Sequence, residues 1–276
     1  MEEEKKVCAS ESAVDGSRDV WSSEPSLASS ADHLVVMVNG ILGRETDWKY
    51  AAEKFVRELP DKVFVHCSER NVSMLTLDGV DVMGGRLAEE VPFLLGVPAF
   101  EKVASCVIHF IFRRTGRHLF LTDDDEGKPP LLKRMVQDYG DLYFMSALRA
   151  FKRRFAYSNV DYDHIVGWRT SSIRRQSELA NWKDTNNEKY PHVVYEEHCK
   201  ACSDAEQCDS TEGNSYDKIE EELVTGLSRV SWEKVDVSFR NSKHRFSSHT
   251  IIQVKDQITQ IEGADVIQHM IDHFLL

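Results

Sequence analysis

The feature that most constrains the fold is an alternation of strand-like and helix-like segments over the first third of the chain. Short apolar runs at 34–38 and 63–67 are rich in β-branched residues and predict two buried strands. Each run is followed by a segment with apolar residues near helical spacing, 46–59 and 78–91. Strands that alternate with helices are typical of a parallel sheet with helices on its faces. The sequence therefore predicts an α/β fold.

We expect the first helix, at 46–59, to be capped by Thr46 or Asp47 and to end before Pro60.

The pattern is less regular after residue 91. The sequence there predicts a helix at 100–113, an extended segment or loop at 118–124 and a second helix at 129–139. It then predicts a strand at 142–145, a last strand at 233–241 and a last helix at 264–276. The polar, acidic stretch from 180 to 220 predicts a long insertion or mobile loop.

The predicted domain organisation is simple. Residues 1–31 are rich in Glu, Ser, Ala and Lys and contain little to bury, so we expect a disordered N-terminal tail. Residues 32–276 are expected to form a single α/β domain, because a chain of this length can bury one large core.

Composition excludes several classes of partner. The net charge of -12 argues against nucleic acid as the main partner. No apolar run reaches the roughly 18–20 residues that span a bilayer, so no transmembrane segment is expected. The N-terminus lacks the apolar core of a signal peptide, and the six cysteines are scattered. We therefore expect a cytoplasmic protein.

The strand at 34–38 runs into the corner Asn39-Gly40-Ile41-Leu42-Gly43. Glycine allows a sharp turn and a close approach of the backbone to a ligand. A backbone N–H freed there, that of Ile41, could face a developing oxyanion, with Gly40 shaping the turn. The alternative is an ordinary turn between a strand and a helix, and these residues alone favour it.

The wider sequence resembles a known family. The segments HLVVMVNGILG, DWKYAAEKFV, DGVDVMGGRLAEEV, HLFLTDDD, VGWRTSSIRR and HMIDHFLL, in this order, resemble the serine esterase or lipase-like family of α/β-hydrolases, most closely its plant branch. The resemblance implies an α/β-hydrolase-like, mostly parallel sheet with helices on both faces. It also implies hydrolysis of carboxylic esters, with an ester or lipid substrate and no cofactor. The Asn-Gly-Ile corner would be the oxyanion loop.

Two members of a Ser-Asp-His triad are identified through this resemblance. Asp163 matches the family's acid, with Asp161 as the runner-up, and His249 lies between the last strand and the last helix, where the family's base belongs. Without the family, Asp163 would be interpreted as a helix cap or a loop-holding residue. His244, His269 and His273 are weaker rivals for the base. His269 and His273 are spaced as i, i+4 and are expected to be structural, with no third metal ligand evident.

The nucleophile is missing from this chain. No Gly-x-Ser-x-Gly and no His-Ser-Leu-Gly-Gly occurs anywhere, and Val91 runs directly into Pro92, so the fold is expected to be truncated around its central strand. One hypothesis is a serine ester hydrolase by family. The other, favoured for the chain as written, is an inactive splice variant or a scaffold or binding protein of the same fold. Other serines to inspect are Ser105, Ser171, Ser172 and Ser248.

Two further clusters are weighed and set aside. The segment with His198, Cys199, Cys202 and Cys208 fits a zinc knuckle loosely, but an incidental cluster is favoured and no metal site is expected. The basic run Lys152, Arg153 and Arg154 has aromatic neighbours. It leaves open a peripheral contact with a membrane, although a solvated helix face is the default.

Overall fold

The computed structural model describes residues 20–21, 31–94, 113–119, 121–124, 127–181, 187–202 and 215–274. The chain divides into two compact units. The first unit comprises Met1–Arg117, Gln253–Ile261 and Ile271–Leu276, and the second comprises His118–Ile252 and Glu262–Met270. Each unit contains its own three-stranded sheet and helices, so the prediction of an α/β protein is confirmed. The sheets are not mostly parallel, since each has one parallel and one antiparallel pair among the described strands.

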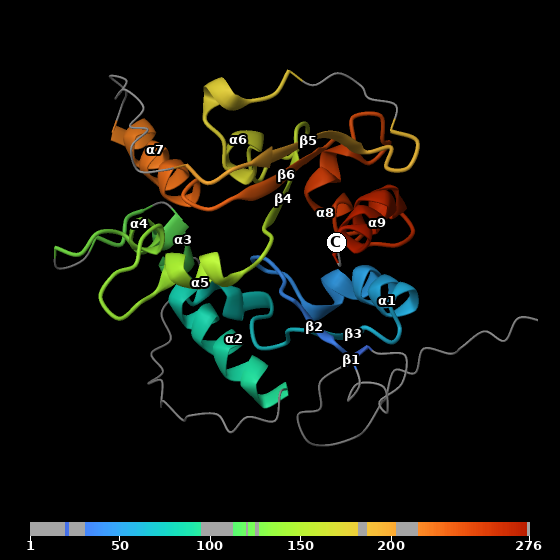
Figure 1. Cartoon of the computed structure of the whole chain (residues 1–276), viewed down its shortest axis with the longest axis horizontal. Helices are drawn as coiled ribbons and strands as arrows, with labels where there is room; N and C mark the ends of the chain where they lie inside the picture. Colours follow the sequence, from blue (N-terminus) through green and yellow to red (C-terminus); the bar gives the residue numbers. More distant parts are fainter. Residues whose placement is uncertain are drawn as a thin grey trace, which may run out of the picture. The chain divides into compact units, whose positions relative to one another are not determined.

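The first unit contains the two strands that the apolar runs predicted. They are β2 (His33–Met37) and β3 (Val63–Cys67), which pair in parallel. A short β1 (Val20–Trp21), inside the segment expected to be a tail, pairs antiparallel with β3. The order β1-β3-β2 leaves β2 at an edge of this sheet among the described strands (Figure 1).

Helix α1 (Lys49–Glu58) covers β3 and closes the core of the first unit (Figure 1). Its buried face consists of Ala51, Ala52, Phe55 and Val56. The N-cap is Trp48 and not Thr46 or Asp47, because a 3-10 turn, η1 (Glu45–Trp48), precedes the helix. Asp47 accepts the N–H of Arg44 in that turn. Next along the chain come η2 (Ser73–Leu77), α2 (Val80–Leu94) and α3 (Arg113–Leu119).

The second unit has a mixed sheet with the order β4-β6-β5. Strand β4 (Phe155–Asn159) is parallel to β6 (Trp232–Val237), and β5 (Val193–Cys199) is antiparallel to β6. The helices and 3-10 turns that lie wholly or mostly in this unit are α4 (Leu131–Met135), α5 (Phe144–Ala150), α6 (Trp168–Ser171), η3 (Gln176–Glu178), α7 (Ser215–Leu227), η4 (Arg245–Ser247), α8 (Ser248–Ile251), η5 (Ile261–Gly263) and α9 (Ala264–Asp272). The core of this unit joins β5 and β6 to α8 and α9 through Val193, Val235, Val237, Ile251 and Val266.

Two sequence predictions in the second unit are wrong. Residues 142–145 do not form a strand but lead into α5, because Asp138 accepts the N–H groups of Met145 and Ser146 and so starts a helix. The strand of this region is β4, which the basic run before it obscured. The stretch 180–220 is not simply a loop, since it contains β5 and the start of α7. The helix expected at 100–113 lies almost wholly outside the described residues.

Candidate active site

Asp163 lies in the loop that follows β4. Its Oδ1 accepts the backbone N–H groups of Ile165 and Val166 at 3.0 and 2.9 Å. The preceding residue, Tyr162, has φ 58°, a left-handed conformation that is uncommon outside glycine. The N-cap of α6 is Gly167. Asp163 therefore organises its own loop and does not cap the helix after it.

His249 lies on α8, which follows β6, and its ring meets Asp163. His249 Nδ1 is 3.1 Å from Asp163 Oδ2, although the residues are 86 positions apart in sequence. The carboxyl ends of β4 and β6 are adjacent because these strands are parallel, with Asn159 opposite Val237. The Asp163 side chain is 7% exposed, whereas that of His249 is 38% exposed. The structure thus brings together the two residues that the resemblance selected.

The charge of Asp163 is favoured by its hydrogen bonds. Burial by itself raises the pKa of this carboxyl, but the N–H groups of Val166 and Ile165 lower it, as do His249 and Asn159, and the net pKa lies below its ordinary value. Asn159 Nδ2 donates to Asp163 Oδ2 at 3.2 Å and to the carbonyl of Ser248 at 3.3 Å. Asn159 thus ties the acid to the segment of the base, a contact that no sequence motif revealed.

The rival acid makes weaker contacts. Asp161 Oδ2 lies 3.5 Å from Ser238 Oγ and 3.7 Å from Arg240, and its side chain is 29% exposed. Among the rival bases, His244 is exposed on the turn before α8. Neither residue has the buried, short contacts that join Asp163 to His249.

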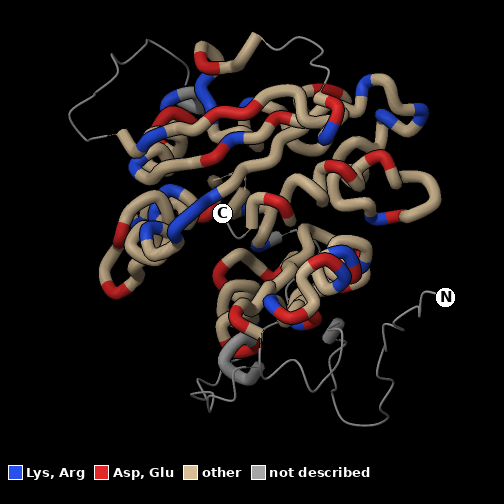
Figure 2. Tube along the Cα trace, turned by 45° about the vertical axis from the view of Figure 1, so that its right-hand side comes forward, with Lys and Arg blue, Asp and Glu red and all other residues tan. Residues whose placement is uncertain are grey.

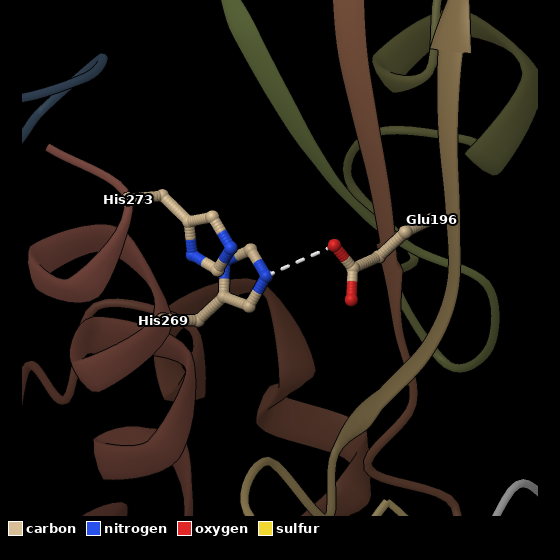
Figure 3. A group of neighbouring side chains, drawn as sticks. All are labelled: Glu196, His269 and His273. Atoms are coloured by element: carbon tan, nitrogen blue, oxygen red, sulfur yellow. Dashed lines mark hydrogen bonds and ion pairs between the residues drawn. The ribbon is translucent and has the colours of Figure 1, made fainter. Parts of the chain in front are cut away.

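His269 lies inside the second unit and is fully buried. Its Nδ1 is 2.9 Å from Tyr157 Oη, and its Nε2 is 3.2 Å from Glu196 Oε2 (Figure 3). Glu196 on β5 supplies a carboxylate beside this ring that sequence spacing did not place there. Because both ring nitrogens are engaged, the arrangement fits a structural role, while the metal-free interpretation of His269 and His273 stays a prediction.

A buried ion pair attaches the segment after Asp163 to the sheet. Arg174 is 1% exposed and forms two hydrogen bonds to the carboxylate of Asp236 on β6, at 2.9 and 2.8 Å. Trp168 Nε1 donates to the same carboxylate at 3.0 Å. Asp236 therefore anchors both ends of the segment 168–174, which fixes where the loop of Asp163 must end.

The Asn-Gly corner belongs to the first unit, directly after β2. Leu42, and not a glycine, takes the left-handed conformation there, with φ 57°. A glycine is required at position 43 because neighbouring atoms lie too close for a side chain. A Cβ there would be 2.8 Å from Asp47 Oδ2 and 2.9 Å from the carbonyl oxygen of Gly40. The N–H groups of Leu42 and Gly43 are hydrogen-bonded, but that of Ile41 has no protein acceptor among the described residues.

A second cluster of triad residue types lies in the first unit. Ser68 Oγ donates to Glu90 Oε2 at 2.7 Å, and His66 Nε2 lies 3.0 Å from Glu90 Oε1. All three side chains are fully buried. The serine hydroxyl is bonded to the carboxylate and not to the histidine, so this cluster joins α2 to β3 and lacks the geometry of a nucleophile and its base.

No described serine hydroxyl is hydrogen-bonded to His249. Ser171 and Ser172 donate to backbone carbonyls of their own turn, and Ser248 Oγ is buried without a partner. Ser105 lies outside the described residues. Cys67 is no substitute nucleophile, because burial raises the pKa of its thiol to about 12. The described part of the chain thus holds an acid and a base without a nucleophile.

The two clusters that were set aside have other partners. His198 Nδ1 is 3.1 Å from Glu233, Cys199 and Cys202 are free thiols, and Cys208 lies outside the described residues. In the basic run, Arg154 donates to the carbonyls of Ser231, Leu148 and Phe151. That arginine therefore fixes a loop and is only partly exposed to solvent. No described helix is long and apolar enough to cross a membrane.

Comparison with known families supplies a match over more than half of the chain. A family model described as Putative serine esterase (DUF676) matches residues 28–92 and 90–173. The two matched segments overlap at residues 90–92, which contain the Val91–Pro92 junction. They include the Asn-Gly corner and Asp163, whereas His249 lies beyond them. Neither a curated protein nor a solved structure matches the chain.

Proposed function

The chain belongs to the putative serine esterase family, and from this premise we propose that Asp163 and His249 are the acid and the base of a serine ester hydrolase. The contact between His249 Nδ1 and Asp163 Oδ2, at 3.1 Å, carries the proposal. A carboxylate can only accept, so Nδ1 bears the proton and Nε2 is left as the acceptor. That is the tautomer a base needs to take a proton from a serine hydroxyl.

The oxyanion donor would come from the corner after β2. The N–H of Ile41 has no protein acceptor among the described residues, and Gly40 precedes it in the turn. A backbone N–H that points at the developing oxyanion stabilises the tetrahedral intermediate of acyl transfer. The substrate class is a carboxylic ester, including lipid esters. No cofactor enters this chemistry, because the acyl group is held by serine and released by water.

Because the sequence lacks the serine nucleophile motif, we infer that the chain as written is inactive. The family matches as two segments that overlap at 90–92, and no Gly-x-Ser-x-Gly occurs in the sequence. Within their own sheets, β2 and β4 are edge strands among the described strands, each with a parallel neighbour on one side only. We propose that an α/β-hydrolase sheet of the parent enzyme placed its central strand and nucleophile elbow between segments that end at Val91 and begin at Pro92.

The alternative function is that of a non-catalytic form, a splice variant or a scaffold, in the cytoplasm. Acid, base and oxyanion donors without serine retain only a small residual rate. This alternative rests on the same junction, and it predicts that the fold is used for binding and not for hydrolysis.

The deciding experiment compares two forms of the protein with a serine-directed fluorophosphonate. The chain as written should not be labelled, whereas a transcript form that retains coding sequence between Val91 and Pro92 should be labelled at one serine. In that longer form, His249→Ala should abolish labelling, and His244→Ala, the matched exposed histidine, should leave it unchanged. Stoichiometric labelling of the short chain, or labelling of the longer form that survives His249→Ala, would overturn the proposal.

A further inference from the structure

Within the second unit, residues that flank Asp163 and His249 in the sequence form an exposed aromatic and basic patch. Tyr162 and Ile165 come from the Asp163 loop, and Phe246 comes from the turn before α8. Ile165 is 74% exposed and Phe246 is 66% exposed, values that are costly for large apolar side chains in water. The Tyr162 and Phe246 rings pack edge to face with centroids 5.5 Å apart. We call this set, with Lys243 and Arg245, the rim patch.

The rim patch contains cations that no described carboxylate neutralises. The guanidinium of Arg245 lies 5.4 Å from the Tyr162 ring centroid and 5.0 Å from that of Phe246. Its Nε is buried without a hydrogen-bond partner, and no described acid pairs with it. Lys243 is exposed and likewise has no ion pair among the described residues. Two aromatic rings thus hold in place a cation that has no carboxylate partner in the described part of the chain.

The segment that contains Lys243, Arg245 and Phe246 has a net positive charge, opposite in sign to that of the whole chain. Acidic and basic positions are interspersed along most of the described trace (Figure 2), and the net charge is -12. Residues 237–249, in contrast, contain Arg240, Lys243 and Arg245 and no carboxylate. The two acids of the loop that contains Tyr162 and Ile165 have other partners, Asp163 with His249 and Asp161 with Arg240.

We propose that the rim patch docks on the surface of an anionic lipid bilayer. Exposed aromatic and aliphatic side chains can enter the interfacial region, while adjacent cations meet lipid phosphates and carboxylates. Single-stranded nucleic acid also binds cations and aromatic rings, but the exposed aliphatic side chain of Ile165 offers no ring for a base to stack on, whereas it can enter a bilayer interface. The proposal also deepens the proposed function, because it names the substrate class as esters of anionic lipids presented in a bilayer. Only this choice of substrate rests on the proposed function, and the docking itself does not.

Vesicle flotation tests the docking directly, because bound protein rises with vesicles while aggregates do not. The chain as written should float with phosphatidylcholine vesicles containing phosphatidylserine, and much less with phosphatidylcholine alone. Phe246→Ser combined with Lys243→Gln should lower the partition coefficient, measured by flotation over a series of lipid concentrations, by about tenfold or more, since one cation alone is worth about fivefold at an anionic surface. Arg245→Gln should lower it by about fivefold.

Phe151→Ser combined with Lys152→Gln is the matched control. Phe151 is 65% exposed, Lys152 is exposed, and the change in composition and charge is identical. The control should float like the unmodified chain. Equal flotation with neutral vesicles, or a loss confined to the control, would overturn the proposal. So would tight binding of a single-stranded oligonucleotide that depends on Phe246 while vesicles are not bound. Fluorophosphonate labelling is a separate readout, so a failure of docking is distinguishable from a failure of the catalytic proposal.

Discussion

At the scale of single residues, the Asp163 carboxylate is the most densely connected group of the candidate site. It accepts two backbone N–H groups, the Asn159 amide and the His249 ring. Asp163→Ala removes all four acceptor contacts and leaves donors without partners, so we expect a loss of about 1–3 kcal/mol in the free energy of unfolding. Denaturant titration with and without the substitution measures this loss.

Asp161→Ala is the control for that substitution. The side chain of Asp161 is more exposed than that of Asp163, and its contacts are 3.5 and 3.7 Å long, so we expect its free energy of unfolding to change by less than about 0.5 kcal/mol. An Asp161 effect as large as that of Asp163 would contradict the assignment.

The contribution of Asp163 to stability also depends on pH. Because the pKa of Asp163 is lowered in the folded chain, its contribution to the free energy of unfolding is complete above about pH 4 and disappears as the pH falls through the folded pKa.

The Arg174–Asp236 pair gives a second prediction at this scale. Both side chains are almost fully buried. Arg174→Ala leaves the Asp236 charge buried with only Trp168 as a donor, so we expect a loss of about 3–5 kcal/mol. Arg175→Ala is the neighbouring control, since Arg175 is 21% exposed and pairs with acids at least 41% exposed, and it should cost about 1 kcal/mol or less. Similar losses for both arginines would show that the pair does not anchor the segment.

At the scale of elements, α2 is attached to β3 by a buried carboxylate. Burial by itself raises the pKa of Glu90, but hydrogen bonds from His66, Ser68 and the N–H of Glu69 lower it to about 2. The resulting stabilisation is complete above about pH 4.5 and is lost as the pH falls toward 2. We expect Glu90→Gln to cost about 2–4 kcal/mol at pH 7 and to reduce the acid dependence of unfolding.

Glu89→Gln is the matched control on the same helix, because Glu89 is exposed. Hydrogen exchange of the β3 amides at pH 7 and pH 3 separates the two variants. Protection of β3 that responds equally to both substitutions would argue against a specific link between α2 and the strand.

At the scale of the whole molecule, the division into two units with separate three-stranded sheets bears on cooperativity. In their own sheets, β2 and β4 are edge strands among the described strands, and unpaired edges favour association with other chains. We expect poor solubility, binding of hydrophobic dyes and a broad unfolding transition. Scanning calorimetry of the monomer is the measurement, and one sharp transition with matching calorimetric and van't Hoff enthalpies would contradict this expectation.

Much of the element order could be predicted from local patterns. The segments 34–38 and 63–67 gave strands within one residue of β2 and β3, and the amphipathic spacing after Trp48 gave α1. Failures occurred where a local pattern was ambiguous. The run 142–145 suits a strand or a helix, and Asp138 decides for the helix by capping it. Strand β5 was missed because its alternation is short and lies in a polar stretch.

The sequence by itself determined the family, the parallel pairing of the first two strands, the absence of a serine elbow and the identity of Asp163 and His249 as residues to examine. The tertiary structure alone decided that these two side chains meet, since their contact depends on β4 and β6 being parallel neighbours. It also decided that Leu42 makes the turn after β2, and that Arg174 and Asp236 form a buried pair. Periodicity reports only neighbours a few positions apart, whereas contacts over 60 to 90 positions follow from strand register, which the pattern of one strand does not contain.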